Sequence, residues 1–218
     1  MKRAAVWLVV AALAMYAAGL ARKHRKAGTQ GSVQFDYYLL SFSWAPNYCA
    51  AHPGDQSSEC TQANHTAFVL HGLWPSSNDD PMKPVSCGPA RPVASDIVRH
   101  MLAYFPDKGL IQHEWQKHGT CSGLSSAQYF GQVEQAYKSI HVPQQYVTPD
   151  HAQTVDVRQM EEDFSKANHA PEAAFRVSCH AGELVGVEVC LSKSLNFQAC
   201  PSTARECRGR QVRMNAPK

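Results

Sequence analysis

Eight cysteines are the feature that most limits what this chain can fold into. They are Cys49, Cys60, Cys87, Cys121, Cys179, Cys190, Cys200 and Cys207. An even number of cysteines behind an export signal is typical of a domain held by disulfides made in an oxidising compartment. No two of them form a C-x-x-C pair, so the pattern disfavours a zinc site or a redox motif. The spacing alone leaves the pairing open.

The N-terminus carries such an export signal. Two basic residues precede an apolar run from Ala4 to Ala21, which ends in small residues. This pattern predicts a signal peptide over residues 1–21, followed by a basic, flexible segment over 22–32. The alternative is an uncleaved membrane anchor, because the run is just long enough to span a bilayer. We expect cleavage, a periplasmic or secreted product, and no stable membrane association afterwards.

The rest of the chain suits one domain. Its total length of 218 residues leads us to expect a single catalytic domain over 33–210 and a flexible basic tail over 211–218. The net charge of +3 comes from the chain ends, because residues 27–204 carry ten Lys or Arg against seventeen Asp or Glu, a net of −7. Bulk charge therefore does not indicate a nucleic-acid binder, and an anionic substrate would need local cations.

Apolar periodicity predicts strands and helices that do not alternate regularly. The expected strands are 33–44, 67–75 (ending near His71) and a hairpin within 174–192 that places Val185, Val187 and Val189 on one face. The expected helices begin near Ser95 and lie within 110–119, 126–140 and 155–168, with a loop over 76–92. The fold class is therefore α+β: a mainly antiparallel central sheet packed by several helices, in one disulfide-stapled domain.

The stretch "HEWQKHGTC" gathers polar groups on one side of a helix. His113 and Lys117 are one turn apart, as are Glu114 and His118 beside them. A zinc protease motif is H-E-x-x-H, whereas here the histidines are five residues apart and Lys117 would repel a cation, so no metal or cofactor is expected. Two histidines, a carboxylate and a lysine suit phosphoryl transfer, which needs a proton acceptor, a proton donor and a cation.

A second segment supplies another histidine. In "HGLWPS", His71 precedes a glycine and a proline, and Trp74 offers a ring on which a nucleobase could stack. Taken alone, a tryptophan is usually core and a histidine is usually structural. The two segments together favour a shared site.

"FVLHGLWPS" and "HEWQKHGTC" together resemble the two active-site segments of the ribonuclease T2 family. The resemblance implies a metal-independent endoribonuclease that cleaves single-stranded RNA, but not DNA, through 2′,3′-cyclic phosphates to 3′-phosphates. By position, His71 matches the general acid and His118 the general base, although the two roles could be exchanged. His113 matches a histidine that holds the phosphate, and Glu114 and Lys117 match the pair that stabilises the pentacovalent state.

The resemblance also implies a base contact at Trp74 and four disulfides. The pairs are Cys49–Cys60, Cys87–Cys121, Cys179–Cys207 and Cys190–Cys200. Ser76 stands where some relatives have an acidic residue linked to base choice, so we expect Ser76 to contact substrate with low base specificity. A monomer is expected. The alternatives are a catalytically silent RNA-binding or toxin-like relative, and a zinc enzyme.

Overall fold

The computed structural model describes residues 33–61, 67–202, 207 and 209–217. The predicted signal peptide and the basic segment after it lie outside these described residues. Within them, no helix is both long enough and apolar enough to cross a membrane.

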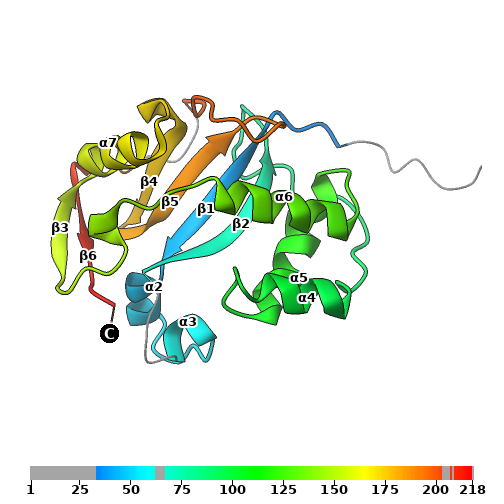
Figure 1. Cartoon of the computed structure of the whole chain (residues 1–218), viewed down its shortest axis with the longest axis horizontal. Coiled ribbons are helices and arrows are strands. Elements are labelled where there is room, and N and C mark those ends of the chain that lie inside the picture. Colours follow the sequence, from blue (N-terminus) through cyan, green and yellow to red (C-terminus); the bar gives the residue numbers. More distant parts are fainter. Residues whose placement is uncertain (1–32, 62–66, 203–206, 208, 218) are drawn as a thin grey trace, which may run out of the picture. The chain divides into compact units, whose positions relative to one another are not determined.

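A six-stranded sheet forms the centre of the domain (Figure 1). Its strands are β1 (Tyr37–Trp44), β2 (Phe68–Ser76), β3 (Gln153–Asp156), β4 (Phe175–His180), β5 (Glu183–Leu191) and β6 (Gln211–Met214). The order is β2-β1-β5-β6-β3, and β4 pairs with β5. The pairings are antiparallel except where β5 meets β6 at Glu183 and Arg213.

Helices pack around this sheet and confirm the α+β class. They are α2 (Ala45–Ala51), α3 (Ser58–Thr61), α4 (Ser95–Met101), α5 (Lys108–Lys117), α6 (Ser126–Lys138) and α7 (Val157–Asn168). Short 3-10 turns lie at Gly119–Cys121, Gln144–Tyr146 and Glu172–Ala174. In Figure 1, α4, α5 and α6 stand beside β2, and α7 stands beside β3 and β4.

The central strand β1 alternates between two clusters, as the period of a strand requires. Tyr38, Leu40, Phe42 and Trp44 enter the main core, together with apolar side chains from α4, α5, α6 and α7. Tyr37 and Leu39 point to the other face, where they form a smaller cluster. Trp74, Cys190, Cys200 and the partly buried Met82 complete that cluster. This second face carries the residues of the candidate site.

Strand β2 does not end near His71, contrary to the prediction. It continues to Ser76, and Gly72 and Pro75 lie within it. A proline is tolerated because β2 is the edge strand, where one side of the backbone needs no ladder partner. The pairing with β1 shifts at this point: Ser41 pairs with Gly72 and Phe42 with Leu70. His71 is thus the extra residue of a β-bulge.

Residues 211–214 are not part of a flexible tail, so that prediction is wrong. They form β6, which pairs with β3, and Val212 and Met214 are fully buried. Asn215 continues the attachment, because its backbone N–H donates to Asn47 Oδ1 and its carbonyl accepts from Trp44 Nε1. The alternation of apolar and polar side chains at 211–214 is a strand pattern, and the basic charge around it hid that signal.

The predicted hairpin is present, but its face is interrupted. Val187 and Val189 are fully buried, whereas Val185 is 46% exposed. Ser178 pairs with Gly186 and Cys179 with Leu184, so Val185 is the extra residue of a bulge.

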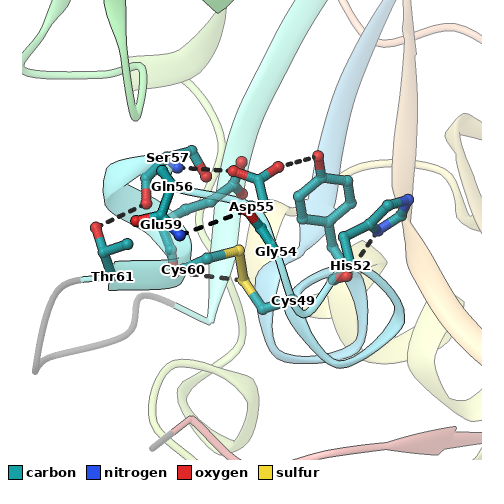
Figure 2. Close-up of a disulfide and its surroundings, with 10 residues drawn as sticks. Cys49, His52, Gly54, Asp55, Gln56, Ser57, Glu59, Cys60 and Thr61 are labelled. Atoms are coloured by element: carbon teal, nitrogen blue, oxygen red, sulfur yellow. Dashed lines mark hydrogen bonds between the residues drawn. A yellow bond between two sulfur atoms is a disulfide. The ribbon is translucent and has the colours of Figure 1, made fainter.

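The four disulfides implied by the family resemblance are all present. Figure 2 shows Cys49–Cys60, which ties α2 to α3. Beside it, the Asp55 carboxylate accepts from the Tyr48 hydroxyl at 2.6 Å and from the Ser57 backbone N–H at 2.7 Å. This disulfide loop is therefore ordered by local hydrogen bonds as well as by the covalent bond.

Candidate active site

Helix α5 carries half of the site, and both of its ends are fixed. Asp107 caps its N-terminus by accepting from the backbone N–H groups of Gly109 and Leu110. At the other end, the Lys117 carbonyl accepts from the Ser86 N–H at 2.7 Å, and the Cys87–Cys121 disulfide joins the same two segments. The helix ends at Lys117 with His118 as its C-cap, so Gly119, the last residue of the predicted range, directly follows the cap.

The packing of α5 decides which side chains reach the sheet. Ile111 is fully buried in the main core, and Glu114 and His118, three and seven residues later, lie on the same face of the helix. Both are buried, with 0% and 3% of their surface exposed. His113 is exposed and Lys117 is partly exposed. The four polar residues of the helix thus divide into a buried pair and an outer pair.

Trp74 joins the two segments at the centre of the site. Its indole N–H donates to Glu114 Oε2 at 2.7 Å, and its ring stacks on the His118 ring at 4.9 Å with 20° between the planes. Only 7% of Trp74 is exposed. The predicted role of Trp74 as an open platform for a base is therefore not supported: the tryptophan orients Glu114 and His118.

His71 faces this group from β2. Its Nδ1 lies 3.0 Å from Ser43 Oγ on β1, and its Nε2 lies 3.7 Å from Glu114 Oε1. The His71 ring meets the Trp74 ring edge-on at 5.3 Å. The side chain remains 39% exposed, so an outside molecule can reach it. The structure therefore brings His71, Glu114 and His118 around Trp74, as the sequence predicts for one shared site.

Gly72 makes this approach possible. A Cβ atom at position 72 would lie 1.9 Å from Glu114 Oε2 and 2.7 Å from Trp74 Nε1. Real Cβ atoms do not come so close to other atoms, so any side chain there would displace the carboxyl group. Gly119, just after α5, also permits a close approach, because a Cβ there would lie 2.4 Å from the Trp115 ring.

Burial sets the protonation of the site. Desolvation raises the pKa of Glu114 to about 8, with the Trp74 hydrogen bond and Lys117 acting against it. Desolvation lowers the pKa of His71 to about 4, helped by the charges of His113 and Lys117. Desolvation also lowers the pKa of His118 to about 3, with Lys117 as the next cause. Near neutral pH, Glu114, His71 and His118 are therefore uncharged.

One atom of the site lacks the partner that its burial requires. Glu114 Oε1 is buried, and no hydrogen bond satisfies it among the described residues. An unsatisfied buried polar atom costs about 1–3 kcal/mol. Glu114 Oε1 also lies 3.7 Å from His71 Nε2. A hydrogen-bonding position between the two segments is therefore unused.

Ser76 lies away from this opening. It is fully buried, and its hydroxyl donates to the Trp74 carbonyl at 3.0 Å. The predicted substrate contact is therefore not supported by its position. Within the described residues, no group of three or more His, Cys, Asp or Glu side chains is arranged to hold a metal ion.

Two residues of the site were not predicted from the sequence. Ser43 lies in the strand predicted over 33–44, and nothing in the sequence marked its hydroxyl. Gly72 was noted only as the glycine that follows His71, although this position was a signal of close packing. Both become visible only when β1, β2 and α5 are placed together.

The fold and the site define a disulfide-bonded α+β domain in which two histidines and a buried carboxyl group surround one accessible point. The model of the ribonuclease T2 family matches residues 35–200 of this chain. The chain therefore belongs to the ribonuclease T2 family.

Named relatives match part of the chain. A ribonuclease of Aeromonas hydrophila is 41% identical over 92 residues, which are 42% of this chain and 40% of that protein. A probable ribonuclease of Haemophilus influenzae is 33% identical over 137 residues, which are 56% of this chain and 50% of that protein. The matches thus span half or less of the length of these two relatives.

Solved structures match a larger share of the chain. An RNase-related protein from Calystegia sepium has a TM-score of 0.69 at 22% identity, covering 85% of this chain and 99% of that one. Trichomaglin, described as an S-like ribonuclease, has a TM-score of 0.70 at 19% identity, covering 85% and 100%. At such identities the likeness shows the fold alone.

Proposed function

We propose that this protein is an exported endoribonuclease that cleaves single-stranded RNA without a metal ion and with low base specificity. The first products are 2′,3′-cyclic phosphates, which are then hydrolysed to 3′-phosphates. The observation that carries the proposal is the unsatisfied Glu114 Oε1 beside His71 Nε2. A phosphoryl oxygen placed there would take up the missing hydrogen bond.

The chemistry follows from the environments of the two histidines. His118 is neutral because burial lowers its pKa to about 3, so it can take the proton of the ribose 2′-hydroxyl. That oxygen attacks phosphorus, the bond from phosphorus to the 5′-oxygen breaks, and the imidazolium form of His71 gives its Nε2 proton to the leaving oxygen. Burial keeps the pKa of free His71 at about 4, so the acid role requires the bound phosphate, an anion, to favour this protonated form.

The outer pair of α5 suits an anionic substrate. Lys117 and His113 both lower the pKa values of His71 and His118 through their charges. A phosphate bound there would meet the side chains of Lys117 and His113, and Glu114 Oε1 would donate to a phosphoryl oxygen. A bound phosphate also raises the pKa of each histidine toward its usual range, because an anion favours the protonated form.

Other features support the remaining parts of the proposal. The buried Ser76 hydroxyl is bound within the protein, which is consistent with low base specificity. DNA would not be cleaved, because it lacks the attacking 2′-hydroxyl. The four disulfides and the signal-like N-terminus support export to the periplasm or the medium. We expect the exported protein to act as a monomer.

The test is digestion of single-stranded RNA in EDTA, with wild type beside His118→Ala and with products identified by mass. We expect wild type to give cyclic phosphates and the variant to be slower by about 1,000-fold, the middle of the range for losing a general base. His151→Ala is the matched control, because this histidine is exposed outside the site. Loss of wild-type activity in EDTA would point to a metal enzyme. A folded wild type that binds RNA without cleaving it would point to a silent relative.

A further inference from the structure

The β-bulge leaves His71 outside the regular pairing of β2 with β1. Its neighbours Leu70 and Gly72 pair with Phe42 and Ser41, and His71 itself has no partner across the strand pair. A bulged residue is free to turn its side chain, which is how bulges redirect side chains near active sites. Contacts with other side chains must therefore hold the ring if it is to work as an acid.

Ser43 is placed to do this. It pairs with Val69, two residues before His71, and its hydroxyl crosses to His71 Nδ1 at 3.0 Å. With Nδ1 held there, Nε2 is the ring nitrogen directed toward Glu114 Oε1, at 3.7 Å. The edge-on contact with Trp74 limits rotation of the ring from a second side.

The direction of the hydrogen bond follows from Glu114. Its Oε2 accepts the Trp74 indole N–H, so a neutral carboxyl group carries its hydrogen on Oε1, facing His71 Nε2. A nitrogen that faces a donor presents its lone pair. A neutral imidazole then has its hydrogen on Nδ1, and this N–H donates to the Ser43 oxygen.

We propose that Ser43 is a positioning residue whose hydroxyl accepts a hydrogen bond from His71 Nδ1–H in both protonation states of the ring, so that protons enter and leave only at Nε2. This inference rests on the proposed function. The same contact serves the acid in cleavage and the base in hydrolysis of the cyclic phosphate, because Nδ1–H is present in both forms. The ring need not turn between the two steps.

The kinetic test compares Ser43→Ala with Ser43→Thr on a short single-stranded RNA. We expect Ser43→Ala to lower kcat by about 10-fold, the value of one charge-assisted hydrogen bond, and to leave KM nearly unchanged. Ser43→Thr retains the hydroxyl and should retain most of kcat. Ser41→Ala is the matched control, since Ser41 is a serine on the same face of β1, opposite Gly72. An equal loss in Ser41→Ala would overturn the proposal.

A second measurement does not depend on activity. Nitrogen-15 NMR of the imidazole separates the Nδ1–H tautomer from the Nε2–H tautomer. We expect wild-type His71 to be the Nδ1–H form at pH 7 and Ser43→Ala to show a mixture. The alkaline limb of kcat/KM should also move to lower pH in Ser43→Ala, because the imidazolium has lost an acceptor. Glu114, His113, Lys117 and His118 also face or act on the ring, and all four remain in this variant.

The outcomes are distinguishable. A wild type with the Nε2–H form, or a Ser43→Ala variant with unchanged kcat and nitrogen shifts, overturns the positioning role. If wild type cleaves no RNA, the proposed function fails, and the nitrogen shifts still decide whether Ser43 fixes the ring.

Discussion

At the scale of single residues, the site depends on Gly72, because this residue has no side chain. Gly72→Ala would place a methyl group 1.9 Å from Glu114 Oε2, so the buried carboxyl group would be displaced. We expect kcat/KM to fall by about 100-fold, as for a displacement of about 1 Å in a catalytic group. Overpacking should also cost about 1–3 kcal/mol of unfolding free energy. RNA cleavage and urea unfolding measure the two effects.

Gly131→Ala is the matched control for this substitution. Gly131 lies in α6, and a Cβ there meets nothing within 4 Å. Alanine should stabilise the helix by about 0.5–1 kcal/mol and leave cleavage unchanged. If Gly72→Ala behaves in the same way, the close approach of Glu114 to β2 is wrong.

The residue scale also shows what a sequence can and cannot reveal about a site. The two histidine segments were recognisable because their residue types are chemically unusual together. Burial could not be inferred, so Trp74 and Ser76 were interpreted as substrate contacts although both lie inside the protein. Ser43 was not predicted because its role comes from a bulge in the neighbouring strand, and strand register is a property of two segments rather than one.

At the scale of elements, β6 shows that a basic stretch near the end of the sequence can still form a strand with buried side chains. Long helices and the β1 strand were predicted correctly because their apolar periods run over many residues. A strand of four residues gives a weak signal, and its partner β3 is equally short. The disulfide pairs followed from the family resemblance, since spacing alone allows many connectivities.

The strand β6 can be tested through one buried side chain. Met214→Ala removes a fully buried side chain from the main core and should cost about 2–5 kcal/mol of unfolding free energy. Arg213→Ala is the neighbouring control, because its ion pair with Glu183 is exposed and should be worth less than about 1 kcal/mol. Urea unfolding measures both. If neither substitution changed the free energy of unfolding, the prediction of a flexible tail would be right.

At the scale of the whole molecule, several buried groups respond to pH with opposite signs. Burial, followed by the charges of Asp55 and Asp107, raises the pKa of Glu59 to about 7, and burial raises that of Glu114 to about 8. A carboxyl group whose pKa rises on folding contributes stability below its unfolded pKa, and this contribution is lost as pH rises through the folded value. His71 and His118, whose pKa values fall on folding, instead destabilise the fold as pH drops below 6.5.

The effects of the two carboxyl groups and of the two histidines on the unfolding free energy oppose each other between pH 4.5 and 6.5. Of these four groups, only the carboxyl groups still titrate between pH 6.5 and 8. We therefore expect the unfolding free energy to fall over that upper range, with Glu59 contributing about 1 kcal/mol of the loss. Urea unfolding at pH 6.5 and pH 8 should show a smaller loss in Glu59→Gln than in wild type. Glu134→Gln is the control, since hydrogen bonds from Lys138, His100 and Tyr104 lower the pKa of Glu134 to about 2, far from this range. A wild type equally stable at both pH values would mean that Glu59 and Glu114 are already ionised at pH 6.5, and the neutral Glu114 that is proposed to donate to a phosphoryl oxygen would be excluded.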